Sequence, residues 1–435
     1  MKKIILSILL LLLLFSFFST KAFSSEIDYE SVDFPEPEKG IDISSLVPIL
    51  EKGSIVIIHS GKTKFITGMV LINAPLDDVW RVVTDYEKYH EFVPNVSRLK
   101  TTESWAERMN GYPISGTQFT EYRLGFKAFG LFSFTIVYTL EQHFDKKTDE
   151  GLIWGCPAPK GEQAFSEVYY RERYKKTNDG RTVMIYTAYA NLASFGLLSK
   201  LVFKSFPELQ VPALVATSTL FPEAIKERVE KIKLIVEPKE VDADNVKVPE
   251  PIQISTIEHL LKKYKKIIIS WYPDKNLIRF FSAYSYLPVP KDKLKTVITD
   301  FENWKRFFRI AKSAEKSEYT DNGFFVNFSL RYKLVFPINF NYTVKYRWVD
   351  TKQCERLYFE LDRSKPKDIE GEWGAWDFYD LGNKSVLGYT VFSDLRSGSL
   401  LFKVLMDNLQ GFGIGLKVGL TSALIEAFSS PQALR

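Results

Sequence analysis

The residues of this 435-residue chain that suit acid–base chemistry are carboxyls, and Asp85 and Glu87 form the first pair to consider. They lie two residues apart in the sequence Thr-Asp-Tyr-Glu, and paired carboxyls are a common source of general acid and base groups. The pattern recurs as Thr-Asp-Phe-Glu at residues 299–302. Because Asp is a preferred residue at the start of a helix, folding alone explains this recurrence. We therefore assign no catalytic role to either residue.

Other carboxyls are judged by the strand face on which they fall. In their strands, Glu141 and Glu360 point to the face opposite to that of the neighbouring apolar residues, so we expect both to face water. Glu121 and Asp377 lie in strands that do not alternate cleanly, and their direction stays open. A cyclase or dehydratase would need a proton-handling group with a shifted pKa inside a cavity. We identify no residue that meets this requirement and predict no catalytic residue.

Histidines and cysteines are too few and too scattered to indicate metal or thiol chemistry. His59 ends an expected strand and His143 follows another, which places both at loop junctions. Cys156 and Cys354 are the only cysteines, so neither a Cys/His metal pattern nor a disulfide framework can be proposed. We therefore expect neither a metal nor another cofactor.

The composition favours a sheet-rich protein with large apolar cores. Hydrophobic residues make up 45% of the chain and aromatic residues 15%, with Phe and Tyr the most numerous aromatics. The formal net charge is +5, and three of the lysines lie within the first 24 residues. The remaining chain is therefore close to neutral, which argues against a nucleic-acid partner because such partners require a concentrated basic surface.

The first 24 residues have the order of a secretory signal peptide. Lys2 and Lys3 precede an apolar run from Ile4 to Phe18, and small and polar residues follow up to Ser24. We expect cleavage near Ser24 and a periplasmic or secreted protein. The alternative is an uncleaved N-terminal membrane anchor. Residues 25–42 are acidic and contain prolines, and we interpret them as an N-terminal arm.

An internal repeat divides the rest of the chain into two halves. Residues 74–92 recur at residues 289–307 with a constant offset of 215, and residues 183–215 recur at 386–418 with an offset of 203. Between the halves lies a segment of Pro, Glu, Asp, Lys and Val without periodicity, which indicates a linker. The predicted boundaries are domain 1 at 43–236, the linker at 237–253 and domain 2 at 254–430.

Each half follows the same order of predicted elements. A short amphipathic segment and two strands come first, and a helix pair follows, with Pro75 or Pro290 expected at the first helical position. Residues 338–348 alternate between apolar and polar side chains, as expected for an antiparallel sheet with one buried face. A long helix closes each half, at 207–231 and at 407–428, and would cover the apolar face of the sheet. We predict further strands at 164–174, 182–191, 355–361, 373–379 and 385–393.

This plan resembles the START-like helix-grip superfamily, also called SRPBCC, in its polyketide cyclase/dehydrase and coenzyme-Q-binding branch. The residues that carry the resemblance are Ile72-Asn73-Ala74-Pro75, Val79-Trp80, Val83-Thr84-Asp85-Tyr86-Glu87, Tyr89 and Glu91-Phe92-Val93-Pro94. Domain 2 departs from the pattern, with Leu294-Lys295 and Phe308-Arg309 at the corresponding positions. The resemblance implies an α+β fold with two tandem helix-grip domains, each a curved antiparallel β-sheet wrapped around a long C-terminal helix.

The resemblance also implies a cavity between each sheet and its closing helix. Such a cavity holds a hydrophobic molecule, such as a lipid, a quinone or a sterol-like or polyketide compound, and a lipid carrier would contact a membrane transiently. Tyr and Trp there would orient the ligand through their polar tips. The predicted lining residues are Phe132, Phe134, Tyr138, Val215, Phe340, Tyr342, Tyr346, Trp348 and Val418.

Three classes of function remain open at this point. The first is an exported carrier or binding protein for a hydrophobic ligand. The second is a cyclase- or dehydratase-type enzyme acting on a hydrophobic substrate. The third is an envelope scaffold that binds another protein through a sheet edge or an apolar groove, which large exposed apolar patches would support. We predict the first class, because we identify no catalytic residue. The superfamily includes binding proteins, enzymes and interaction modules, so a fold alone does not establish function.

Overall fold

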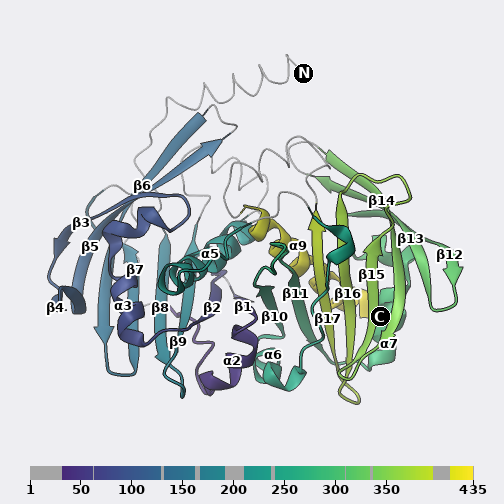
Figure 1. The fold of residues 1–435 in the computed structure, drawn as a ribbon, viewed down its shortest axis with the longest axis horizontal. Coiled ribbons are helices and arrows are strands. Elements are labelled where there is room, and N and C mark those ends of the chain that lie inside the picture. The colour runs from purple at the N-terminus through teal and green to yellow at the C-terminus, as the bar shows by residue number, and fades with distance from the viewer. Residues whose placement is uncertain are drawn as a thin grey trace.

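The structure is a computed structural model, and nearly all of its regular elements belong to one large antiparallel sheet with helices on both faces (Figure 1). It describes residues 32–61, 63–128, 132–161, 167–191, 210–236, 241–308, 310–333, 337–394 and 412–434. The expected signal peptide at residues 1–24 lies outside the described residues.

Both halves contain the expected order of elements. The first half consists of η2 (Ile43–Leu46), α2 (Val47–Leu50), β1 (Gly53–Ile58), β2 (Ile66–Ile72), α3 (Leu76–Val83), η3 (Tyr86–Glu91), β3 (Val96–Ser104), β4 (Glu107–Met109), β5 (Tyr112–Ala128), β6 (Phe132–Lys146), β7 (Glu150–Pro157), β8 (Val168–Lys176), β9 (Thr182–Ala190) and α5 (Gln210–Glu230). Between the halves lie η6 (Ala243–Asn245) and η7 (Ile254–Thr256). The second half consists of α6 (Glu258–Tyr264), β10 (Lys266–Trp271), β11 (Phe281–Leu287), α7 (Lys291–Thr299), η8 (Phe301–Arg306), β12 (Ala311–Thr320), β13 (Gly323–Lys333), β14 (Pro337–Asp350), β15 (Glu355–Leu361), β16 (Gly371–Asp380), β17 (Ser385–Asp394), α9 (Phe412–Phe428) and α10 (Pro431–Leu434).

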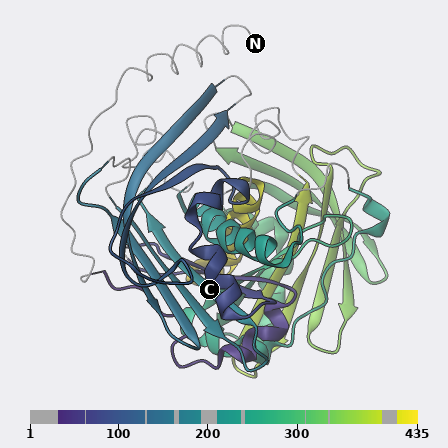
Figure 2. The same cartoon turned by 60° about the vertical axis from the view of Figure 1, so that its left-hand side comes forward.

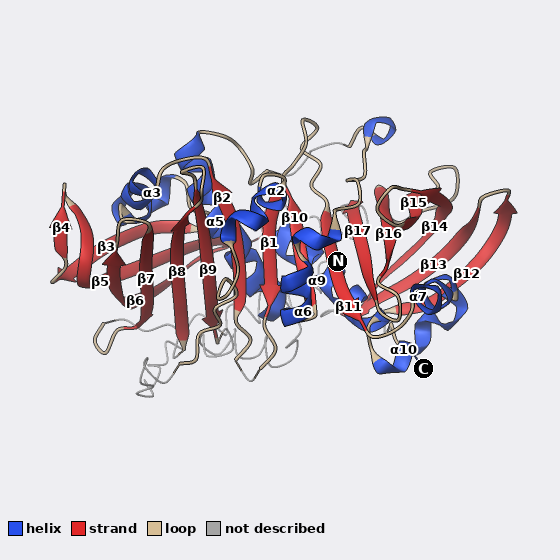
Figure 3. Cartoon of the chain, turned by 90° about the horizontal axis from the view of Figure 1, so that it is seen from below, coloured by secondary structure: helices blue, strands red, loops and turns tan. Residues whose placement is uncertain are grey.

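The strand order runs through both halves without a break. In the first half β3 and β4 pair with β5, the strands β5 to β9 follow in chain order, β9 pairs with β2, and β2 pairs with β1. In the second half β10 pairs with β11, β11 with β17, and the strands from β17 back to β12 pair in succession. The junction is an antiparallel pair between β1 and β10. The described residues therefore form one 17-stranded sheet (Figure 3).

An approximate two-fold axis passes through the junction. Val56 lies opposite Gly68 in β2, and Ile268 lies opposite Ala283, the residue of β11 that corresponds to Gly68. Val56 and Ile268 are thus equivalent positions, and they also lie directly opposite each other across the β1–β10 pair. The two halves consequently join through the same strand edge, as the subunits of an isologous dimer do.

The long helices α5 and α9 lie side by side on one face of the sheet (Figure 2). α5 contacts β1, β2 and β9, and α9 contacts β10, β11 and β17. The other face of the junction carries α2 and α6, whose apolar residues pack against those of β1 and β10. The expected closing helices at 207–231 and 407–428 are confirmed over α5 and α9, and the first residues of both ranges lie outside the described residues.

α5 approaches β2 at a glycine. A Cβ atom on Gly68 would lie 1.8 Å from the carbonyl oxygen of Ser218, so no other residue fits without moving the helix. Pro222 lies inside α5, four residues after Ser218, and cannot donate the helical hydrogen bond to that carbonyl. The carbonyl oxygen of Ser218 therefore receives no hydrogen bond from residue 222 of the helix, at the point where α5 comes closest to the sheet.

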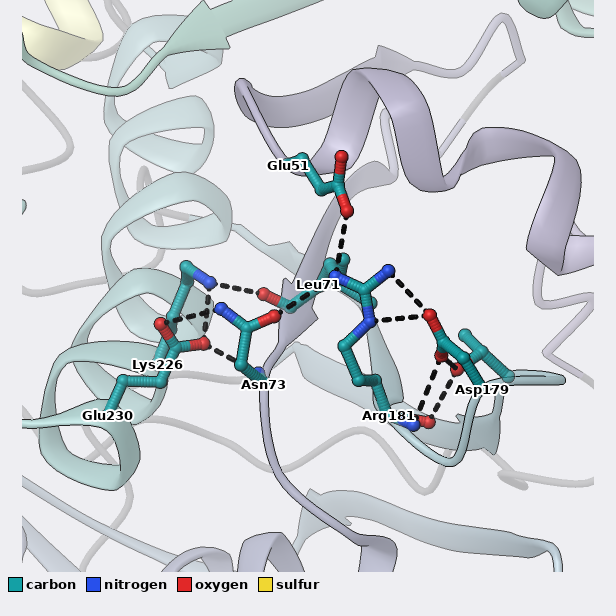
Figure 4. Close-up of polar contacts among 8 residues, drawn as sticks. Glu51, Leu71, Asn73, Asp179, Arg181, Lys226 and Glu230 are labelled. Carbon is teal, nitrogen blue, oxygen red and sulfur yellow. Dashed lines mark hydrogen bonds and ion pairs between the residues drawn. The ribbon is translucent and has the colours of Figure 1, made fainter.

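A polar network holds the C-terminal end of α5 against the sheet (Figure 4). Lys226 Nζ donates to the carbonyl of Leu71 at 2.6 Å and to Glu230 Oε1 at 2.6 Å. Glu230 also accepts from the backbone N–H of Asn73 at 2.7 Å, and Arg181 in turn donates to the side chain of Asn73 at 3.2 Å. The network fixes the helix relative to the ends of β2 and β9.

Two local expectations need correction. Pro75 and Pro290 stand at the N-cap of α3 and α7 instead of the first helical position, because both have extended backbone angles and the helices begin one residue later. The sequence pattern also did not indicate β3, β7 or β12, which carry the sheet away from the closing helices. The strands expected at 355–361, 373–379 and 385–393 are confirmed as β15, β16 and β17.

Candidate ligand-binding site

The interior of the first half lies between the concave part of its sheet and α5. Apolar residues of β2, α3, η3, β6, β7, β8 and β9 pack there against Ile225, Phe221 and Val229 of α5. Tyr86 and Tyr89 of η3 are only 3% and 2% exposed. This region is the part of the helix grip in which a ligand is expected.

A buried carboxyl lies in this interior. Glu172 of β8 is 3% exposed, and the hydroxyl of Tyr174 donates a hydrogen bond to it. Burial raises the pKa of Glu172 to about 8, because the charged form loses its hydration. The side chain is therefore largely protonated at neutral pH and can donate as well as accept a hydrogen bond.

Gln142 is the second polar centre of the same interior. Its side chain is fully buried, and Nε2 donates to the hydroxyls of Tyr122 at 2.9 Å and Tyr170 at 2.5 Å. Two polar atoms nearby, Gln142 Oε1 and the hydroxyl of Tyr86, have no well-formed hydrogen bond to any of the described residues. Burial raises the pKa of Tyr86, and Gln142 is close enough to oppose that rise. An unsatisfied buried polar atom costs about 1–3 kcal/mol, and the indole Nε1 of Trp376 in the second half is another buried atom of this kind.

A glycine makes room for Tyr170. Gly155 of β7 lies opposite Tyr170 of β8, and a Cβ at Gly155 would lie 2.3 Å from the tyrosine ring. The phenol therefore lies across the neighbouring strand with its hydroxyl at Gln142. In the second half the same cross-strand pair is reversed, with Phe359 on β15 opposite Gly374 on β16.

The register identifies the residues of the second half that occupy the same places. Glu172 lies opposite Tyr186 and Trp376 lies opposite Tyr389, so Trp376 corresponds to Glu172. Following the pairing through the sheet, Tyr346 corresponds to Gln142. The polar residues Tyr86, Tyr89, Tyr122, Gln142, Glu172 and Tyr174 thus correspond to Phe301, Trp304, Phe328, Tyr346, Trp376 and Phe378.

Aromatic rings fill these positions in the second half. Trp376 lies 6.2 Å from Trp304 and 5.1 Å from Phe428, measured between ring centroids. Phe428 belongs to α9, stands where α5 has Ile225, and lies 4.7 Å from Trp304. The described interior of the second half is therefore a contiguous aromatic core at the level where the first half is polar.

The second half keeps one polar group of its own, near the start of β16. Burial raises the pKa of Glu372 to about 7, and hydrogen bonds to Tyr342 and Ser393 oppose that rise. Ser393 Oγ donates to Glu372 Oε1 at 3.4 Å. This carboxyl lies four residues before Trp376 along the strand and touches the aromatic core, because it is hydrogen-bonded to Tyr342 and acts electrostatically on Tyr346.

The predicted lining residues of the first half are only partly described. Phe132 and Phe134 belong to β6, but their side chains lie outside the described residues. Tyr138 is half-buried and stacks on Tyr122 with 5.1 Å between ring centroids. Val215 of α5 is buried, but its core also includes residues of the second half. Their contact with a ligand stays a prediction.

The predicted lining residues of the second half all belong to its core. Phe340, Tyr342, Tyr346 and Val418 are at most 8% exposed, and Trp348 is half-buried beside them. The inward direction that alternation predicts for Phe340, Tyr342 and Tyr346 is confirmed. Their contact with a ligand stays a prediction.

The rejected and undecided carboxyls lie away from both interiors. Asp85 forms an ion pair with Lys88 at 2.8 Å, and Glu87 is exposed. Asp377 is fully buried, but it stands on the opposite strand phase from Trp376 and pairs with Arg356 at 2.6 Å and 2.9 Å.

The remaining candidates also lie outside the interior. Glu141 contacts His143 at 3.1 Å on the outer phase of β6, and Glu121 accepts from Arg123 at 2.8 Å. The expectation that His143 follows a strand is wrong, because β6 continues past it to Lys146. Glu360 is half-buried on the outer phase of β15. His59 directly follows β1 as predicted, but it is buried, and burial lowers its pKa to about 4.

Sequence reasoning missed Glu172, although a signal was present. In the strand from Val168 to Lys176, Glu172 shares its phase with Tyr170 and Tyr174, and an acidic residue between two inward tyrosines indicates a buried carboxyl. Glu172 therefore meets the requirement stated for an enzyme, because it is a proton-handling group with a shifted pKa in the interior. The sequence did not lead us to this residue.

Two further findings concern the described residues. They contain no group of three or more His, Cys, Asp or Glu side chains placed to hold a metal ion. Within the same ranges, no helix has both the length and the apolar character needed to cross a membrane.

Comparison with known proteins supports the fold. The family model described as "Polyketide cyclase / dehydrase and lipid transport" matches residues 72–148, which include the motif that carries the resemblance. No curated protein matches the sequence.

Several solved structures are similar at low sequence identity. The STAR-related lipid transfer protein from Xanthomonas axonopodis is 14% identical with a TM-score of 0.30, over 37% of this chain and 94% of that one. Human STARD10 is 14% identical with a TM-score of 0.29, over 42% of this chain and 82% of that one. The di-domain ARO/CYC StfQ from the steffimycin biosynthetic pathway is 11% identical with a TM-score of 0.27, over 83% of this chain and 96% of that one.

The matched motif and the arrangement of sheet and helices agree with each other. Each half has a curved antiparallel sheet, a helix pair after the second strand and a long helix against the sheet. The chain therefore has the START-like, or SRPBCC, fold in two tandem copies.

Proposed function

We propose that this chain binds a hydrophobic small molecule or lipid, and that the first half is the half that holds it. The fold supports either the binding of a hydrophobic ligand or a cyclase-type function. The two halves differ in the chemistry of their interiors, and this difference favours the first half as the binding half.

The observation that carries the proposal is the polar cluster around Gln142 and Glu172. Both side chains are at least 97% buried, and Gln142 Oε1 and the hydroxyl of Tyr86 lack hydrogen-bond partners within the described ranges. A protein interior normally satisfies such atoms, whereas ligand sites combine apolar walls with a few polar groups. A bound molecule with one polar group would complete these hydrogen bonds and cover the apolar wall.

The second half serves, in this proposal, as a structural partner. Its corresponding positions hold Trp376, Tyr346 and Phe428 in mutual contact with other rings. Rings packed in this way stabilise a core through apolar burial. The second half would then support the first through the shared sheet and the α5–α9 contact.

A cyclase- or dehydratase-type enzyme is a second candidate, favoured by Glu172. A carboxyl that keeps its proton at neutral pH is suited to act as a general acid on a substrate oxygen. The same cluster would serve both functions, and turnover of the bound molecule separates them.

Export is part of the proposal and rests on the sequence of residues 1–24 alone. A scaffold function receives less support. The exposed large hydrophobic side chains among the described residues are Trp105, Met109, Ile232, Leu277 and Tyr319, which stand at four separate places along the chain.

Mass spectrometry of organic extracts from gently purified protein tests the proposal. We expect a hydrophobic molecule to co-purify with the wild-type chain and to be lost from Gln142→Tyr, which gives the first half the residue of the second. Glu103→Gln, on an exposed position of β3, is the control and should retain the molecule. Thermal unfolding shows whether each variant is folded. Equal retention by a folded Gln142→Tyr would contradict the site.

A further inference from the structure

We propose that the polar group recognised in the first half is a hydroxyl on an apolar body, held between Tyr86 and Gln142. This inference rests on the proposed function and adds the chemical class of the ligand. It follows from what each unpartnered atom needs and from the finding that, in the described part of the chain, no Lys or Arg is hydrogen-bonded to this cluster.

The two unpartnered atoms have different requirements. Gln142 Oε1 can only accept a hydrogen bond, because Nε2 carries both amide protons and donates them to Tyr122 and Tyr170. The hydroxyl of Tyr86 can donate or accept. A ligand hydroxyl satisfies both, since it donates its proton to Gln142 and accepts from Tyr86.

The other orientation of the amide leads to the same ligand. If the hydroxyls of Tyr122 and Tyr170 donate to Oε1, the amide N–H groups of Gln142 face Tyr86 instead. A ligand hydroxyl then accepts from Gln142 and donates to Tyr86. A ketone or quinone oxygen only accepts, so it completes one orientation of the amide and leaves the other unsatisfied. The hydroxyl is the group that suits both.

An ionised head group does not suit this interior. No Lys or Arg among the described residues donates a hydrogen bond to Tyr86, Gln142 or Glu172. A carboxylate or phosphate moved here would lose its hydration without gaining a counter-ion, which is strongly unfavourable. A protonated Glu172 adds a neutral donor close by and no charge.

The neighbours keep the two atoms in place. Tyr86 belongs to η3, packs 5.2 Å from Tyr89 and 6.4 Å from Phe144 between ring centroids, and cannot swing towards solvent. Gln142 lies in the middle of β6 between the paired strands β5 and β7. Recognition would therefore be specific for the position of the hydroxyl on the ligand.

Three probes with one ring system test the inference in the full-length chain. These are 2-naphthol, 2-methoxynaphthalene and 2-acetylnaphthalene, with dissociation constants measured by fluorescence titration at pH 6. We expect 2-naphthol to bind about tenfold or more tightly than the other two, as two net hydrogen bonds imply. In Tyr86→Phe and Gln142→Leu the preference should shrink to about twofold.

The controls separate this inference from the proposed function. Tyr346→Phe alters the position in the second half that corresponds to Gln142 and should leave the preference unchanged. If all three probes bind equally well, the hydroxyl inference is wrong and hydrophobic binding stands. If none of them binds, both are contradicted. If a folded Tyr86→Phe keeps the full preference, the assignment of the hydroxyl to this place is wrong.

Discussion

At the scale of single residues, the two halves of the chain differ most where Glu172 corresponds to Trp376. A protonated carboxyl among tyrosines gives the first half hydrogen-bonding capacity, and an indole packed against Trp304 and Phe428 gives the second half an aromatic contact at the same place. Neither replacement disturbs the strand, because both side chains point inward at the same register. The two interiors thus differ in chemistry at equivalent positions of the sheet.

Glu172 should make the stability of the protein depend on pH. Its pKa is about 8 in the folded state and near the ordinary value of 4.5 in the unfolded state, so between these values the folded chain holds a proton that the unfolded chain has released. The free energy of unfolding should therefore fall as the pH rises, by up to about 1.4 kcal/mol per pH unit from this group. In Glu172→Gln this contribution should be absent.

Urea unfolding of wild type and Glu172→Gln at pH 5, 6, 7 and 8 measures the effect. As the pH rises, the free energy of unfolding of Glu172→Gln should increase relative to that of the wild type. Glu103→Gln, an exposed position, should follow the wild type throughout. A wild-type profile parallel to that of Glu172→Gln would show that Glu172 is ionised in the folded protein.

Sequence alone located the inward faces but not the chemistry within them. Alternation correctly placed Phe340, Tyr342 and Tyr346, because a half-buried strand exposes every second side chain. Glu172 and Gln142 were missed because carboxyl and amide side chains are expected at the surface, and only the cross-strand register shows that they meet the hydroxyls of Tyr122, Tyr170 and Tyr174.

At the scale of elements, the distance between α5 and the sheet depends on Gly68. The backbone oxygen of Ser218 reaches β2 where a Cβ would lie 1.8 Å away, and Pro222 leaves that oxygen without a helical partner. In the second half Ala283 stands at the position of Gly68, and Ile425 stands at the position of Pro222. We therefore expect α9 to cover its sheet without this contact.

Gly68→Ala should therefore push α5 away from β2. We expect the free energy of unfolding to fall by about 3 kcal/mol, since an added methyl group in a closed contact forces the backbone to shift. Gly125→Ala is the matched control in β5, where the nearest atom, Cβ of Ser97, would be 3.4 Å away, and it should change stability far less. Equal effects of the two substitutions in urea unfolding would contradict the close approach.

The order of elements was predictable, but some members were not. Proline positions, the repeated Thr-Asp-aromatic-Glu pattern and period-two alternation located the helix pair and the later strands. β3 and β12 carry mostly polar residues because they form the two ends of the sheet, so no hydrophobic periodicity marks them.

At the scale of the whole molecule, the halves form one body through a shared sheet and a buried ion pair. Glu223 of α5 is fully buried and accepts from Arg279 of the second half at 2.8 Å and 3.0 Å. Ser54 of β1 also donates to Glu223, and Arg279 donates to Ser270 of β10. The β1–β10 junction is thereby tied to α5 by groups from both halves.

Arg279→Met should destabilise the junction by about 3–5 kcal/mol, because it leaves the carboxylate of Glu223 buried without a counter-charge. The double variant Glu223→Leu/Arg279→Met should recover most of this loss. Urea unfolding gives the free energies, and hydrogen exchange should show lower protection in β1 and β10 together. A single variant as stable as the wild type would contradict the role of the ion pair.

The pairing of β1 with β10 could not be predicted from the repeat. Duplication predicts two similar halves, but it does not show which edges meet, because Gly53–Ile58 and Lys266–Trp271 read as ordinary buried strands. The pairing of Val56 with Ile268 joins residues far apart in the sequence, and only the folded structure shows it.

Native mass spectrometry of the full-length chain saturated with 2-naphthol tests the central claim most directly, because it counts the molecules held per chain. The account predicts one molecule per wild-type chain, none in a folded Gln142→Tyr, and one in Tyr346→Phe. Two molecules per chain, or one that persists in Gln142→Tyr and is lost in Tyr346→Phe, would show that the aromatic half binds the ligand and would contradict the account.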